Sequence, residues 1–166
     1  MAEIETNLRV IKRSRKKPEP GDVFAMRVSD GSYLFGRVIE SEMPRTRAPM
    51  PGSNLIYVYR DRSQTPEPVL DDLRPDRLLI PPVFINRKPW TRGYFLTVAH
   101  QELTGNDVLP QHCFWDALRK HHVDEQLNVL PQELSPCGVW GLSSYRSLDD
   151  KISDALDIPR APRERQ

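Results

Sequence analysis

The chain has 166 residues, which suits one domain with a hydrophobic core of its own but not two enzyme-sized domains. Its 24 Lys and Arg residues nearly balance its 23 Asp and Glu residues, and the formal charge of +1 excludes a surface that is basic all over, as nucleic-acid-binding proteins commonly have. The hydrophobic fraction is 38%, and no apolar run approaches the roughly 18 residues of a membrane span.

The N-terminal segment is basic and rich in proline. Residues 1–20 lack the apolar core followed by small residues that marks a secretory signal. Five cations lie within residues 12–17, and Pro18 and Pro20 follow them. Like charges repel and prolines disfavour regular pairing, so we predict a flexible basic arm over residues 1–20. We expect a cytoplasmic protein whose two cysteines are reduced thiols.

The strongest local pattern lies in residues 21–40, GDVFAMRVSDGSYLFGRVIE. Two runs with the two-residue period of strands flank Asp30 and Gly31, a pair that suits the tight turn of a β-hairpin. Gly36 lies inside the second run, where glycine is expected only if the strand bends or another group approaches it closely. This segment predicts a β-rich fold.

A predicted loop and a predicted central strand follow the hairpin. Residues 41–53 are basic and interrupted by prolines, so we predict a loop that projects from the sheet. Residues 54–60, NLIYVYR, carry β-favouring side chains on both faces. A strand that is apolar on both faces is typical of the centre of a sheet.

The middle of the chain alternates polar loops with further strands. Residues 61–76 predict a loop with at most one helical turn. Pro81 and Pro82 cannot donate ladder hydrogen bonds, so residues 78–85 should form a short edge strand or a crossing segment. Further strands are predicted at residues 90–100, with a bend at Gly93, at residues 113–118, within residues 121–131 and at residues 138–142.

One short helix should close the fold. Residues 147–156 have helical apolar spacing, with Ser147 as the N-cap and with Asp149 and Asp150 in the first turn, where the helix dipole favours anions. Residues 158–166 predict a disordered tail. We therefore expect a mainly β protein (β-rich α+β) with a twisted antiparallel sheet or a partly open small barrel and one short C-terminal helix, in a single domain over residues 21–157.

An ordered series of segments carries a family resemblance. The segments are KKPEPGDVFAMRVSDGSYLFGRVIE, LIYVYR, LLIPPVFINRKPWTRGYFLTV, HHVDEQLN and GVWGLSSYRSLDDKISDAL, and they span roughly residues 16–157. The series resembles the Imm26-type immunity proteins of bacterial polymorphic toxin systems. The resemblance implies a small β-rich cytoplasmic protein that binds and neutralises a cognate protein toxin encoded nearby. It carries over no catalytic residue, and the loop at residues 41–53 looks like an insertion.

Inhibition by occlusion needs aromatic and arginine anchors rather than acid–base chemistry. Such residues lie on the projecting loop and at the start of the strand predicted at residues 90–100. We predict these partner-binding residues: Arg45, Arg47, Trp90, Arg92 and Tyr94. The aromatic members could instead pack in the core or at a sheet edge, and we expect Trp115 and Trp140 to be core residues.

Catalytic and cofactor motifs are not found in the sequence. Ser143 and Ser144 lack the GxSxG elbow of serine hydrolases, and neither GxGxxG nor a P-loop occurs. Four residues could donate metal ligands, but their spacing matches none of the common zinc patterns; they are His112, Cys113, His121 and His122. We expect hydrogen-bonded or solvent-facing histidines, no metal, no cofactor and no enzymatic activity.

The alternative function is a nucleic-acid-binding or ribonuclease-type small β-barrel protein. The cations of residues 12–17 could contact phosphates, and Tyr33, Tyr57 and Tyr59 could stack on bases. Without those five cations, however, the rest of the chain holds fewer basic residues than its 23 acidic ones. An acidic surface is better suited to a basic toxin, such as a nuclease, than to a nucleic acid.

Overall fold

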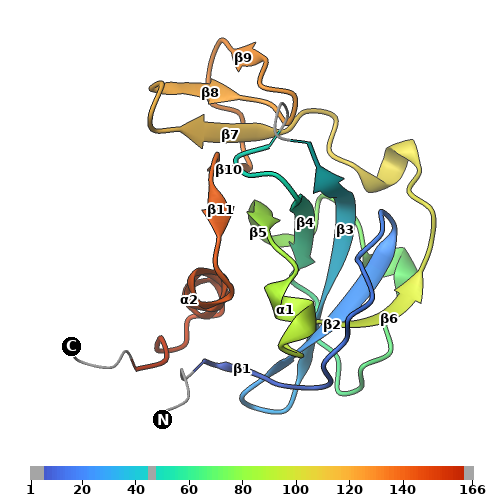
Figure 1. Cartoon of the computed structure of the whole chain (residues 1–166). Helices are drawn as coiled ribbons and strands as arrows, with labels where there is room; N and C mark the ends of the chain where they lie inside the picture. The colour runs from blue at the N-terminus through green and yellow to red at the C-terminus, as the bar shows by residue number, and fades with distance from the viewer. Residues whose placement is uncertain (1–5, 45–47, 163–166) are drawn as a thin grey trace.

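The computed structural model, which describes residues 6–44 and 48–162, is mainly β as predicted (Figure 1). In these residues a curled seven-stranded sheet has the order β1-β2-β3-β4-β5-β11, with β6 also pairing with β2, and a four-stranded sheet has the order β10-β7-β8-β9. The large sheet comprises β1 (Leu8–Arg9), β2 (Asp22–Val28), β3 (Tyr33–Met43), β4 (Ser53–Tyr59), β5 (Leu78–Ile85), β6 (Leu96–His100) and β11 (Leu142–Ser143). The small sheet comprises β7 (Cys113–Asp116), β8 (His121–Val123), β9 (Val129–Leu130) and β10 (Cys137–Val139).

The helical part is small. Among the described residues it comprises α1 (Lys88–Thr91), α2 (Tyr145–Ala155) and the 3₁₀ turns η2 (Leu70–Asp72) and η3 (Gly105–Asp107). The turn η2 is the single helical turn expected in the polar loop at residues 61–76. No helix in the described part of the chain has the length and apolar character needed to cross a membrane.

The predicted hairpin is formed by β2 and β3. The Val28 N–H donates to the Ser32 carbonyl across the turn, and Gly31 has a φ of +88°, which favours glycine. Gly36 lies opposite Phe24, and a Cβ on it would lie 2.3 Å from the Phe24 ring. That ring stacks on Phe95 at 4.3 Å between centroids. The glycine is therefore required because an aromatic ring packs directly against the strand.

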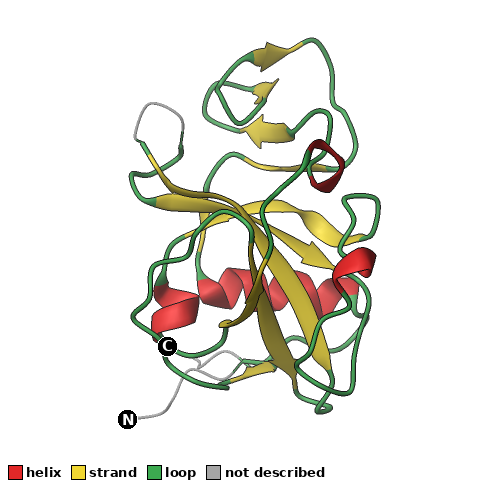
Figure 2. Ribbon diagram, turned by 90° about the vertical axis from the view of Figure 1, so that its right-hand side faces the viewer, coloured by secondary structure: helices red, strands yellow, loops and turns green. Residues whose placement is uncertain are grey.

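The strand β4 is central, as its apolar pattern predicts. It lies between β3 and β5, and all seven of its residues are buried. Ile56 belongs to the core cluster that includes Leu148 of α2, whereas Tyr57 belongs to the cluster that includes Phe114 of β7. Figure 2 shows the longest helix across one face of the large sheet and the small sheet beyond the end of the large one. Both faces of β4 are thus covered, by different parts of the chain.

The proline pair lies inside β5 at a break in the ladder. Val58 pairs with Ile80 and Ile56 pairs with Val83, so the register shifts across Pro81 and Pro82. On its other edge β5 pairs with β11 only at Phe84 and Ile85. The prolines are tolerated because they occupy a bulge and leave no ladder donor missing.

The strand predicted at residues 90–100 is too long. Residues 88–91 form the turn α1, with Pro89 in its first turn, and β6 begins only at Leu96. Proline is well suited to a helix start because its φ is preset and it has no N–H to satisfy. Gly93, with a φ of +89°, ends the turn. Trp90 is therefore buried in a helical turn and does not pair in a strand.

The predicted N-terminal arm lies against the domain along its described residues. Leu8 is buried and pairs with Val28 of β2, and the Ile11 N–H donates to the Gly93 carbonyl at 2.8 Å. Farther along, the Ser14 N–H donates to the Trp90 carbonyl. The prediction rested on the cations and the prolines, whereas the apolar Leu8 and the backbone donors hold the segment against the domain. Residues 1–5 lie outside the described residues.

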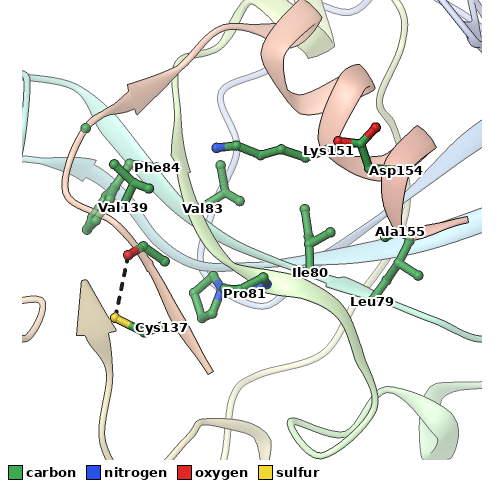
Figure 3. A pocket seen from close by; sticks show the side chains of 13 residues that line it. Leu79, Ile80, Pro81, Val83, Phe84, Cys137, Val139, Lys151, Asp154 and Ala155 are labelled. Atoms are coloured by element: carbon green, nitrogen blue, oxygen red, sulfur yellow. Dashed lines mark hydrogen bonds between the residues drawn. The ribbon is translucent and has the colours of Figure 1, made fainter. Parts of the chain in front are cut away.

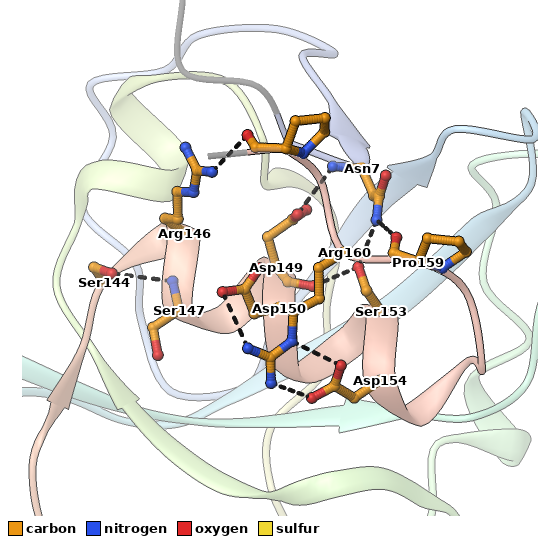
Figure 4. A network of polar contacts seen from close by, with 11 residues as sticks. Asn7, Ser144, Arg146, Ser147, Asp149, Asp150, Ser153, Asp154, Pro159 and Arg160 are labelled. Atoms are coloured by element: carbon orange, nitrogen blue, oxygen red, sulfur yellow. Dashed lines mark hydrogen bonds and ion pairs between the residues drawn. The ribbon is translucent and has the colours of Figure 1, made fainter. Parts of the chain in front are cut away.

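The helix α2 begins three residues earlier than predicted. Its N-cap is Ser144, whose Oγ accepts the Ser147 N–H, and its first turn holds no acidic residue. Asp149 is buried and accepts the backbone N–H of Asn7 at 2.9 Å (Figure 4). It also accepts the backbone N–H of Leu8 at 2.8 Å. This carboxylate therefore anchors the N-terminal segment. The prediction that it complements the helix dipole is wrong, because it lies beyond the first turn.

The described part of the predicted disordered tail also contacts the domain, at α2. Arg160 forms a two-pronged ion pair with Asp154 of α2, and Arg146 donates to the Pro162 carbonyl (Figure 4). The Asn7 side chain donates to the Pro159 carbonyl at 2.8 Å, so the two described ends of the chain meet beside α2. Residues 163–166 lie outside the described residues, where the predicted disorder stays a prediction.

Candidate functional site

Two hollows flank the segment 137–142, which links the two sheets. The first, here called the helix groove, lies between β5, β10 and α2 and has a volume of about 480 Å³ (Figure 3). Its walls are mostly apolar, with Pro81, Val83 and Val139 among them. Its one lysine is Lys151, a half-buried residue of α2. The Lys151 ammonium donates to the Ser143 hydroxyl at 3.0 Å, and burial lowers its pKa.

The second hollow, here called the loop groove, is larger, about 690 Å³. Three separate segments and one side chain line it: residues 48–51, residues 116–119, residues 140–142 and Leu127. The apolar residues on its rim are unusually exposed: Leu118 at 87%, Met50 at 53% and Leu142 at 37%. Exposed apolar residues that gather around one hollow are typical of an interaction surface.

The turn that carries Leu118 is held rigidly. The buried Asp116 carboxylate accepts the N–H groups of Leu118 at 3.1 Å and Arg119 at 3.2 Å, and it pairs with the Arg119 guanidinium at 2.9 Å. Burial alone would raise the pKa of Asp116, but the Arg119 guanidinium and these amides hold it below its ordinary value. The carboxylate therefore stays ionised, and the turn presents Leu118 and Arg119 to solvent in a fixed conformation.

The opposite wall is fixed by aromatic packing. The Trp140 N–H donates to the Trp115 carbonyl at 2.8 Å, and the Trp140 ring lies edge-on to Phe84 at 5.1 Å between centroids. Trp140 is half-buried and packs against the core, whereas Trp115 is 37% exposed, so the interpretation of Trp115 as a core residue is wrong. The side chain of Trp115 packs against His122 on the outer face of the small sheet.

A buried polar network joins the two sheets. The Tyr57 hydroxyl lies 2.5 Å from His112 Nε2, and His112 Nδ1 lies 3.0 Å from Glu125. Burial raises the pKa of Tyr57 to about 12, so its hydroxyl remains protonated. The prediction of a hydrogen-bonded histidine is confirmed for His112. Because Tyr57 and Tyr59 are fully buried, neither can stack on a base as the nucleic-acid alternative requires.

The predicted partner-binding residues are scattered. Trp90 is only 1% exposed and packs against Phe24 and Phe95, so it cannot serve as a surface anchor. Arg92 is exposed and lies over the Tyr145 ring, on which Tyr94 also stacks. These three form a small surface cluster, outside both grooves. Arg45 and Arg47 lie outside the described residues, next in sequence to the loop-groove segment 48–51.

Sequence reasoning missed the residues that line the loop groove. Met50 and Leu118 are single apolar residues within polar segments, and scattered exposed apolar residues are common in any protein. Only the fold brings their segments together. A weak signal was available at residues 116–119, because an aspartate side chain can close a turn by accepting a backbone N–H that follows it.

The two cysteines lie side by side. Cys137 of β10 lies opposite Cys113 of β7 in the register of the two strands. Their Sγ atoms are 2.7 Å apart, and both thiols are free. His122 of β8 belongs to the same cluster, in which the donor atoms all lie within 4.8 Å of one another. Burial, together with the Cys113 thiol and the charge of Glu133, raises the pKa of the Cys137 thiol to about 12. The Cys137 thiol is therefore protonated at neutral pH. A second such cluster, of oxygen and nitrogen donors only, comprises Glu19, Asp22 and His100.

Comparison with known proteins places the chain in a family. A family model described as immunity protein 26 (Imm26) matches residues 19–124, which hold the large sheet from β2 to β6 and the first two strands of the small sheet. No curated protein matches the chain, and no solved structure matches it.

Proposed function

This chain belongs to the immunity protein 26 family, and we propose that it binds a cognate protein toxin and blocks it through the loop groove, without catalysis of its own. The match supports the immunity role that the sequence resemblance implies. We further propose that the protein acts in the cytoplasm and that its toxin is encoded nearby.

The observation that carries the proposed site is the set of exposed apolar residues around the loop groove. Interface cores are enriched in aromatic residues, methionine and arginine, and they depend on a few anchors in hollowed surfaces. Met50, Leu118 and Leu142 are exposed there, beside Arg119 and the half-buried Trp140. The helix groove has fewer exposed apolar residues on its walls, and the cluster of Arg92, Tyr94 and Tyr145 lines neither groove.

The anchors are also fixed before binding. The carboxylate of Asp116 closes the turn around Leu118 and Arg119, and ordering a loop on binding would otherwise cost free energy. Arg45 and Arg47 directly precede the groove-lining residues 48–51 in the sequence, so their predicted contact with the partner concerns the same loop. We keep both in the proposed interface.

We also propose that the toxin is a basic protein such as a nuclease. Apart from the five cations of residues 12–17, the chain has fewer basic than acidic residues. Opposite charges speed association, and salt screens them. Association should therefore slow markedly as salt is raised, as stopped-flow mixing of the two proteins would measure. A rate that does not depend on salt would contradict a basic toxin but leave the groove proposal standing.

The test of the interface is co-expression with the product of the adjoining gene, scored by growth, together with the dissociation constant of the purified pair. Leu118→Asp places a charge at the most exposed anchor, and we expect at least about a 30-fold loss of affinity and loss of protection. Val69→Asp is the matched control, because Val69 is also exposed, at 63%, but does not line the loop groove. It should protect the cell fully.

Other outcomes separate the competing surfaces. If Leu118→Asp binds like the unmodified protein while Arg92→Glu fails to bind, the partner face lies at the Arg92 cluster and the groove proposal is wrong. If neither variant affects protection, both surfaces are excluded. Recovery of RNA or DNA that dissociates in salt, with no toxic protein partner, would favour the nucleic-acid alternative instead.

A further inference from the structure

We propose that Cys113, His122 and Cys137 form a binding site for a thiolate-preferring divalent cation of the Zn²⁺ type, which links three strands of the small sheet. The inference goes beyond the proposed immunity function and does not depend on it. The site combines residues from β7, β8 and β10, none of which is adjacent to another in the sequence.

The strand register puts all three donors on one face of the small sheet. Cys137 is paired with Cys113, and His122 is paired with Trp115, which lies two residues after Cys113 on the same face. The intervening residue Phe114 points the other way, into the core shared with the large sheet. The donors therefore converge because of the pairing itself, and their donor atoms lie within 4.8 Å of one another.

The donor set suits zinc. Two sulfurs and one imidazole nitrogen are typical zinc ligands, and three protein donors leave a fourth position for water. The backbone N–H of Leu134 points at the Cys113 Sγ, 3.5 Å away, which is the kind of outer contact that supports a metal-bound thiolate. Two sulfurs bound to one zinc at about 2.3 Å each lie about 3.7 Å apart in a tetrahedral site, so these Sγ atoms would separate by about 1 Å on binding.

The small sheet also has a structural use for such a link. Its strands have only two to four residues, and sheets with so few ladder bonds gain stability from metal or covalent cross-links. An ion held by β7, β8 and β10 would fix the start of segment 137–142, whose later residues line the loop groove.

The experiment is a Co²⁺ titration of the full-length protein under reducing conditions, followed by Zn²⁺ competition and thermal unfolding. We expect one equivalent of Co²⁺ to give sulfur-to-cobalt charge-transfer bands, which Zn²⁺ abolishes, and we expect Zn²⁺ to raise the melting temperature. His122→Gln and Cys137→Ser should each weaken binding by more than about 100-fold, beyond the effect usual for outer-shell changes. His121→Gln is the matched control, since the neighbouring residue in β8 lies on the opposite face, and it should bind normally.

Three results would overturn the proposal. The first is the absence of charge-transfer bands in a protein with two free thiols. The second is cobalt binding that His122→Gln leaves unchanged but His100→Gln removes, which would assign the ion to the cluster of Glu19, Asp22 and His100. The third is a pair that forms a disulfide in air and binds no metal when reduced, which would make the two cysteines a redox pair instead.

Discussion

The two sheets differ in how they are stabilised. The large sheet is packed on both faces, by α2 on one and by the small sheet and adjoining loops on the other, and its central strand β4 is fully buried. The small sheet packs one face on the core, through Phe114 and Val123, and its strands are short. Its other face carries Trp115, His122 and the two cysteines.

The difference suggests a division of labour. The large sheet supplies the apolar burial that keeps the chain folded, while the small sheet uses polar contacts and turns to hold exposed residues in place. Side chains that are exposed and rigid at once are those that bind a partner with little loss of conformational entropy. A destabilising substitution in the large sheet should therefore weaken the whole fold, whereas one in the small sheet should act locally.

The largest effect is expected from Phe24→Ala in the large sheet. Phe24 is fully buried and contacts both Trp90 and Phe95. Removing the ring leaves a cavity, and the free energy of unfolding should fall by about 3–5 kcal/mol. Chemical denaturation measures this loss, and amide exchange should accelerate throughout the chain. An effect confined to β2 would contradict the view that the large sheet unfolds as one unit.

The network between the sheets should give a smaller and more local effect. Tyr57→Phe removes the hydroxyl that contacts His112 and accepts the Leu109 N–H. Two polar groups lose their partner, so we expect a loss of about 1–3 kcal/mol. Hydrogen exchange should accelerate in β7 to β9 and remain slow in β2 to β4. Equal acceleration in both sheets would show that this network does not act mainly on the small sheet.

The turn of the small sheet should depend on pH. The pKa of Asp116 is lowered from its unfolded value of 3.8, so the unfolded chain binds the proton more readily and acid weakens the turn. The stabilisation is fully present above pH 3.8 and is lost as the pH falls through the lower folded value. Asp116→Asn should cost about 1 kcal/mol at pH 7, the value of one hydrogen bond. Denaturation midpoints of the two proteins should converge in acid; a constant difference would contradict this role.

The smallest effect on stability is expected for Leu118→Asp. The side chain is almost fully exposed, and its removal breaks no described hydrogen bond. The free energy of unfolding should change by less than about 0.5 kcal/mol, as is usual at surface positions. Chemical denaturation of this variant therefore distinguishes loss of partner binding from loss of the fold. A large destabilisation would mean that Leu118 packs in the fold more than its exposure indicates.

Local signals predicted much of the large sheet. The hairpin could be identified because a two-residue period flanks Asp30 and Gly31, and β4 because both its faces are apolar. The strand predicted at residues 138–142 could not be resolved, because it is split between β10 and β11, which pair with β7 and β5 in different sheets. Such parallel pairings depend on distant segments, and local periodicity carries no information about them.

The candidate sites were hidden for the same reason. The loop groove combines segments near residues 50, 118 and 141, and the cysteine cluster combines positions 113, 122 and 137. No spacing along the chain matches either arrangement. Trp90 shows the converse error, in which β-favouring residues suggested a strand although Pro89 starts a helical turn that buries the ring.

The hydrogen bond between Asn7 and Pro159 joins positions that are 152 residues apart, so the described backbone is nearly a closed ring. In a ring the place where the chain is cut matters less than the contacts inside it. Residues 64–67 are all exposed and lie between β4 and η2, where a break would interrupt no strand. Joining the present ends with a short linker and cutting there should give a circular permutant with the same two sheets, the same grooves and a new pair of ends.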